Sequence, residues 1–61
     1  MMNDLKFELG QHVRLKTSDE EGHVVGRAEY EASEPAYYIR YRGGDGRQIE
    51  AWWGESALTE A

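Results

Sequence analysis

The chain has 61 residues, contains no Cys and carries a formal net charge of −5, from twelve acidic and seven basic side chains. This length allows one domain and leaves no room for a second. The lack of Cys excludes disulfides and thiolate metal ligands, so strand packing or self-association must supply the stability that so small a domain needs.

The acidic side chains lie mainly in the first half of the chain. Residues 1–34 contain eight acidic and four basic side chains, whereas residues 35–61 contain four and three. The overall acidity argues against a general affinity for nucleic acid, because such binding neutralises phosphates with basic side chains.

The sequence favours a cytoplasmic protein that does not associate with membranes. Residues 1–7 lack the basic and apolar regions of a signal peptide, and no apolar run approaches the length of a membrane span. The absence of Cys fits a reducing compartment.

Residues 1–8 are predicted to be a lead-in segment of a single domain that extends over residues 1–61. Phe7 and Leu9 alternate with charged neighbours. This stretch therefore either adds a short strand or covers one end of the domain.

Residues 12–16 alternate strictly between polar and apolar side chains, which predicts the first strand, with Val13 and Leu15 pointing inward. A polar turn over residues 17–22 follows this strand. It ends in Gly22, the residue type best able to adopt a positive φ.

Residues 23–30 are predicted to form the second strand, one face of which contains Val24, Gly26, Ala28 and Tyr30. Gly26 inside a strand indicates a bulge or a sharp bend, which allows a sheet to coil tightly. Residues 31–35 are predicted to be a loop, because Pro35 cannot donate to a strand ladder.

The clearest element is a hairpin, made of strands over residues 37–42 and 47–53 and a turn over residues 43–46. The turn contains Asp-Gly between two alternating runs, a strong hairpin signal. The face without charges is expected to point inward and contains Tyr37, Ile39, Tyr41, Ile49, Ala51 and Trp53. The opposite face contains Tyr38, Arg40, Arg42, Gln48, Glu50 and Trp52.

After the hairpin, residues 55–57 are predicted to form a single helical turn before a short closing strand with Leu58 inward. Four or five short strands separated by turns predict an all-β domain: a small five-stranded barrel, closed or nearly closed, with a short helical turn before the last strand.

Two stretches resemble the Src-homology-3-like barrels of the KOW and Tudor type. Gly10 before the first strand, together with Gly22-His23-Val24-Val25-Gly26, is similar to the opening of such barrels. Trp53-Gly54-Glu55-Ser56-Ala57-Leu58 is similar to their last turn and closing strand. The resemblance covers roughly residues 8–60 and consists mostly of glycine and apolar spacing, so it implies a fold and no particular activity.

Catalysis, a metal site and a cofactor are not expected. His12 and His23 are the only imidazoles and are predicted to face solvent. A barrel of this size fills its interior with side chains, which leaves no cavity for a small-molecule substrate. The carboxylate run over residues 19–21 lacks the ligand spacing of a calcium loop, and the glycines of residues 43–46 fit a hairpin turn better than a phosphate loop.

The outward aromatic side chains are the one candidate binding feature. Tyr38, Arg40 and Trp52 would form a stacking or cation–π surface, with Tyr30 as a further wall. KOW and Tudor relatives bind nucleic acid, proteins or methylated side chains through such surfaces, which is what the resemblance implies. The alternative is that Tyr38 and Trp52 only stabilise the hairpin, or that the lead-in segment covers them.

Three functions remain open from the sequence. The first is a protein-interaction or self-association module that uses the Tyr38 and Trp52 face, and it is the one we favour. The second is a nucleic-acid-binding module that uses Arg40, Arg42, Arg47 and the aromatic side chains. The third is an acidic decoy or inhibitor protein, in which the carboxylates of residues 19–21 engage a basic partner.

Overall fold

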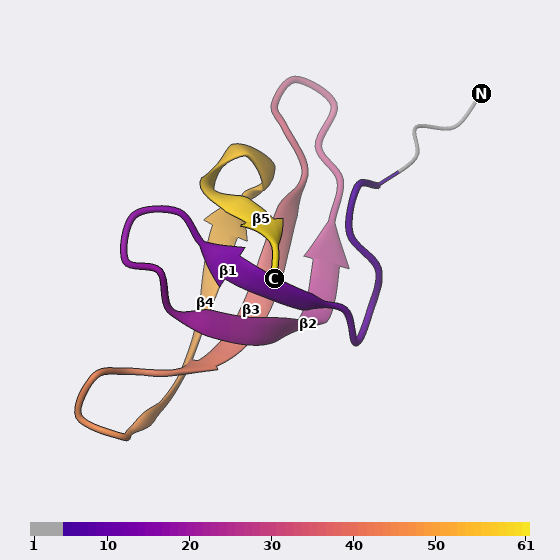
Figure 1. Cartoon of the computed structure of the whole chain (residues 1–61). Coiled ribbons are helices and arrows are strands. Elements are labelled where there is room, and N and C mark those ends of the chain that lie inside the picture. Colours follow the sequence, from indigo (N-terminus) through magenta and orange to yellow (C-terminus); the bar gives the residue numbers. More distant parts are fainter. Residues whose placement is uncertain (1–4) are drawn as a thin grey trace.

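Five antiparallel strands form a single sheet in the computed structural model, which describes residues 5–61 (Figure 1). They are β1 (His12–Leu15), β2 (Glu21–Ala28), β3 (Ala36–Arg42), β4 (Gln48–Gly54) and β5 (Leu58–Glu60), and a 3₁₀ turn, η1 (Glu55–Ala57), precedes β5. The predicted all-β class and the helical turn before the last strand are therefore confirmed.

The strand order is β4-β3-β2-β1-β5, so β4 and β5 are the two edges of the sheet and it does not close by hydrogen bonds within residues 5–61. The expected barrel is thus a bent, open sheet. No helix of these residues is long and apolar enough to cross a membrane.

The inner face of the sheet holds the core. Seven side chains are fully buried, and Tyr41 and Trp53 pack against them. Those seven are Phe7, Val13, Leu15, Val24, Tyr37, Ile39 and Leu58. The predicted inward positions of β1, of the hairpin and of Leu58 are confirmed, because each lies on the apolar side of an alternating strand.

The stretch before β1 covers the core rather than adding a strand. Phe7 is fully buried, and its ring meets the edge of the Tyr37 ring at a centroid distance of 5.2 Å. Leu9, the other apolar side chain of this stretch, is 60% exposed. The part of the predicted lead-in segment that precedes Leu5 lies outside the described residues.

A bulge in β2 changes the predicted second strand. Val24 pairs with Ile39, but Gly26 pairs with Tyr38, so one extra residue stands between them. The prediction of a bulge at Gly26 is confirmed, whereas the prediction that Val24 and Gly26 share a face is wrong. The extra residue reverses the alternation, and Gly26 therefore lies on the outer face.

The residue after Gly26 is turned toward the core side by the same reversal. Arg27 pairs with Tyr37, and its Nη1 donates to the carbonyl oxygen of Phe7 at 3.1 Å. This contact ties β2 to the segment that covers the core.

The turn between β1 and β2 is shorter than predicted, because β2 begins at Glu21. The residue with a positive φ is Asp19, at 63°, rather than Gly22. Gly22 lies inside β2 opposite Tyr41, and a Cβ atom there would meet the Arg40 carbonyl oxygen and lie 2.6 Å from the Tyr41 Cβ. Gly22 is therefore needed for a close approach of β2 to β3.

Tyr37 connects three distant parts of the chain through its hydroxyl group. The hydroxyl donates to Glu55 Oε2 at 2.6 Å and accepts from the backbone N–H of Phe7 at 3.3 Å. Burial, and then the hydrogen bond to the Glu55 carboxylate, raises the pKa of Tyr37 above its ordinary value of 10.0.

The close approach at Gly22 predicts that an alanine substitution lowers stability far more at Gly22 than at Gly44. Gly22→Ala is expected to lower the free energy of unfolding by about 1–3 kcal/mol, because the new methyl group meets backbone that cannot move away cheaply. Gly44→Ala is the matched control, since nothing lies within 4 Å of a Cβ at that position. Urea unfolding of both variants measures the difference, and equal stabilities would contradict the close approach.

The Tyr37 hydroxyl predicts a loss of stability in Tyr37→Phe of about 1–3 kcal/mol at neutral pH, because a hydrogen bond to a charged carboxylate is lost. Since the folded state raises the pKa of Tyr37, its contribution is complete below pH 10 and declines as the pH rises further. The stability difference between wild type and Tyr37→Phe should therefore shrink above pH 10 in denaturation measured across that range. A stability difference that stays constant across that range would contradict the raised pKa of Tyr37.

Candidate functional site

The outer face of the β3–β4 hairpin carries two stacked aromatic side chains. Tyr38 and Trp52 are direct cross-strand partners, and their ring centroids are 5.0 Å apart with the planes tilted by 43°. The Trp52 side chain is 53% exposed, whereas the neighbouring Trp53 packs against the core. The predicted assignment of the two indoles to opposite faces is confirmed.

Gly26 extends this row to a third strand. It lies opposite Tyr38 on β2, and a Cβ there would be 3.2 Å from the Tyr38 Cβ and 3.9 Å from the Trp52 Cη2 atom. Because Gly26 has no side chain, the Trp52 indole extends over the backbone of β2 at this position. The sequence signalled the bulge at Gly26 but not that the bulge brings this residue beside the aromatic pair.

Arg40 lies on the same outer face, on the next row of the sheet. Its Nε donates to Glu50 Oε2 at 2.6 Å across the hairpin. The structure therefore brings Arg40 close to the aromatic pair but gives its guanidinium a carboxylate partner. Within residues 5–61 the cation–π contact is instead that of Lys6 over Phe7, at 5.5 Å.

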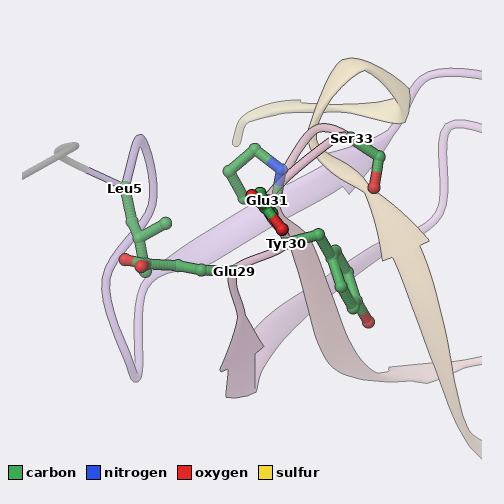
Figure 2. Close-up of a pocket in the computed structure, with 6 residues that line it drawn as sticks. Leu5, Glu29, Tyr30, Glu31 and Ser33 are labelled. Atoms are coloured by element: carbon green, nitrogen blue, oxygen red, sulfur yellow. The ribbon is translucent and has the colours of Figure 1, made fainter.

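Tyr30 lies away from the aromatic pair in a hollow of its own. It follows the end of β2 and is 54% exposed. The hollow has a volume of about 330 Å³ and is lined by Leu5, Glu29, Tyr30, Glu31, Ser33 and Pro35. In Figure 2 the Glu29 side chain reaches toward Leu5, while the Tyr30 ring points to the opposite side. Tyr30 thus forms no ring contact with Tyr38 or Trp52 among the described aromatic pairs.

The two histidines continue the row that holds Arg40. His12 and His23 are cross-strand partners with ring centroids 6.4 Å apart, and His23 pairs with Arg40 on its other side. In the part of the chain that the structure describes, no three His, Asp or Glu side chains are grouped to hold a metal ion.

The acidic turn between β1 and β2 is partly neutralised by β1. The Arg14 guanidinium lies 3.1 Å from Glu21 and 4.0 Å from Asp19, while Glu20 accepts a hydrogen bond from Ser18 at 3.2 Å. These contacts are exposed, so each contributes little to stability.

No family model matches this chain. No curated protein matches it in sequence. Function is therefore inferred from the chemistry of the surface itself.

The stacking of Tyr38 on Trp52 predicts a measurable coupling between them. In a double-mutant cycle of Tyr38→Ala and Trp52→Ala, the coupling free energy should be about 0.5–1 kcal/mol, because the two rings are in contact across the hairpin. A cycle of Tyr38→Ala with Thr17→Ala, in the β1–β2 turn, should give a value near zero. Urea unfolding measures both cycles, and equal coupling in the two would show that the rings do not interact.

Proposed function

We propose that this chain is a small non-enzymatic binding module that docks a protein surface on the outer face of its β3–β4 hairpin. The observation that carries the proposal is the Trp52 indole, half exposed yet held against Tyr38. Tyr, Trp and Arg are the side chains enriched at the energetic centres of protein interfaces. An indole already fixed by stacking loses little conformational freedom on binding, which favours affinity.

The charges near the indole favour a protein partner over nucleic acid. Arg40 is paired with Glu50 at 2.6 Å, and the Arg47 Nε lies 3.8 Å from Asp45. Each guanidinium that already faces a carboxylate has less positive potential to offer a phosphate. Nucleic-acid binding through Arg40, Arg42 and Arg47 is therefore the second candidate.

A role as an acidic decoy or inhibitor has less support than protein docking or nucleic-acid binding. Arg14 contacts two of the three carboxylates of residues 19–21. This arrangement lowers the negative potential that a basic partner would meet, and it fits a solvated turn.

At the level of family, we propose a relation to the Src-homology-3-like barrels of the KOW and Tudor type in a cytoplasmic protein. Support comes from the strand order, in which β1 lies between β2 and β5, and from η1 directly before β5. The open sheet is compatible with a small barrel-like fold, and recognition of a partner through an aromatic surface is the property this relation would explain.

The proposal predicts that partner binding depends on Trp52. Affinity capture with immobilised wild type, Trp52→Ala and Leu9→Ala, followed by titration of each purified captured protein, compares two exposed apolar side chains. Trp52→Ala should weaken binding at least about tenfold, the cost of a truncated interface centre, while Leu9→Ala should bind as wild type does.

Two results would contradict this function. One is equal binding by wild type and Trp52→Ala for every captured protein. The other is a salt-dependent rise in anisotropy with short labelled oligonucleotides that is lost in Arg42→Ala, which would favour the nucleic-acid candidate instead.

A further inference from the structure

Strand β4 presents a free edge whose hydrogen-bonding groups can be assigned. The Gly43 N–H donates to the Arg47 carbonyl at 2.9 Å, and the Glu55 N–H donates to the Pro35 carbonyl at 2.9 Å. These two bonds lie before and after the β3–β4 ladder. Because bonded pairs alternate along an antiparallel ladder, odd-numbered residues of β4 face β3 and even-numbered ones face away.

The outward-facing backbone groups therefore belong to the even-numbered residues, which are Gln48, Glu50, Trp52 and Gly54. Within residues 5–61, β3 is the only strand that pairs with β4. A row of unpaired N–H and C=O groups is a template for another strand.

The two edges of the sheet differ in how they are protected. β5 has three residues and ends in Glu60, whereas β4 has seven residues in unbroken register with β3. β4 contains neither Pro nor Lys, the residues that commonly block an edge. Its only charged side chain, Glu50, is paired with Arg40. Nothing in β4 itself opposes the approach of a further strand.

We infer that a second copy of this chain pairs with β4 along this edge, antiparallel, with Ala51 opposite Ala51 of the second copy. The inference rests on the proposed function and names the partner of the same hairpin. The pairing joins the two open sheets into one continuous sheet, with a twofold axis that passes between the two Ala51 residues.

This register is favoured by the side chains that it brings together on the inner face. Ile49 of one copy lies opposite Trp53 of the other, and both side chains are only half-buried in the single chain. Moving the pairing by two residues in one direction would set Glu50 opposite Glu50. Moving it by two in the other direction would place Ile49 opposite Glu55. The register with Ala51 opposite Ala51 avoids these two unfavourable pairs, and it pairs all seven residues of β4.

On the outer face the same register aligns opposite charges. The Glu34 carboxylate lies over Gly54, where a Cβ would stand 3.1 Å from the Glu34 Cδ. Gln48 of the second copy lies opposite Gly54, and Arg42 is the cross-strand partner of Gln48. The Glu34 carboxylate accepts from the N–H and the hydroxyl of Ser56 at 2.9 and 3.1 Å, and this pairing adds an amide donor beside it and a guanidinium one strand further away.

The net charge of −5 does not prevent this approach. The acidic residues 19–21 lie at the end of the β1–β2 turn and the start of β2, two strands away from the β4 edge. The hairpin that meets the second copy contains Arg40, Arg42 and Arg47 against Asp45 and Glu50. Self-association also supplies buried area to a domain that has no disulfide.

Amide hydrogen exchange of the wild-type chain at low and high concentration tests the strand pairing directly. The N–H groups of Glu50 and Trp52 should become protected as concentration rises, while those of Ile49 and Ala51 are protected throughout because they bond to β3. Sedimentation should report a monomer–dimer equilibrium with a Kd on the order of 10 µM to 1 mM, as expected for a small interface.

Two variants locate the interface. Trp52→Glu should raise the dimer Kd at least about tenfold, because the new carboxylate lies opposite Glu50 of the second copy in this register. Leu9→Glu, the same change at another exposed apolar side chain, should leave the Kd unchanged. Ala51→Cys introduces the only thiol of the chain and should form an intermolecular disulfide under mild oxidation, since facing residues of a non-bonded antiparallel pair are about 4.5 Å apart at Cα. Gln48→Cys is its control and should cross-link poorly.

A chain that sediments as a monomer at every concentration, with the Glu50 and Trp52 amides exchanging freely, would overturn the inference. So would a dimer whose Kd is unchanged in Trp52→Glu and in which these amides stay unprotected. A monomer whose Trp52 still governs the capture of a different protein refutes the self-pairing alone. Loss of both self-pairing and Trp52-dependent capture refutes the proposed function as well.

Discussion

The bulge between Val24 and Gly26 is the constraint on which the rest of the structure depends. Before the bulge, β2 supplies Val24 to the core. After the bulge the two faces of the strand are exchanged, so Gly26 lies on the outer face. Arg27 lies on the other face and donates to the Phe7 carbonyl oxygen in the segment that covers the core. A single extra residue thus allows one strand to serve the core at one end and the aromatic surface at the other.

The small core is extended by contacts between segments far apart in the chain. Phe7 and Glu55 both meet the Tyr37 hydroxyl, one through its N–H and the other through its carboxylate. The segment before β1 and the turn before β5 are therefore both bonded to β3, the first strand of the hairpin. With no disulfide available, such links hold the ends of an open sheet together.

Alternation of apolar and polar residues was enough to predict the fold class, the strands of the hairpin and the inward position of Leu58. It also distinguished Trp52 from Trp53, because adjacent residues of a strand must face opposite sides. The faces of β2 beyond Val24 were not predictable, since a bulge signalled by Gly26 does not reveal which residue is extra. The same limit hid the position of Tyr30, whose expected strand ends at Ala28. The sequence placed Arg40 and Glu50, with opposite charges, on the same face of the predicted hairpin. That they form an ion pair follows only from the register of β3 against β4, which the sequence pattern did not determine.

Two identical indoles in succession leave the alignment of β4 only weakly specified by side-chain size. If β4 slipped by one residue against β3, an indole would replace an indole at the core, and the volume there would hardly change. The cost of that error falls on the other residues: Glu50 would move from Arg40 to the inner face opposite Ile39, Ile49 and Ala51 would turn outward, and the bond from Gly43 to Arg47 would break. The alternating polar and apolar residues before the indoles, together with the turn and one ion pair, therefore fix the register of this hairpin, which the two largest side chains alone do not.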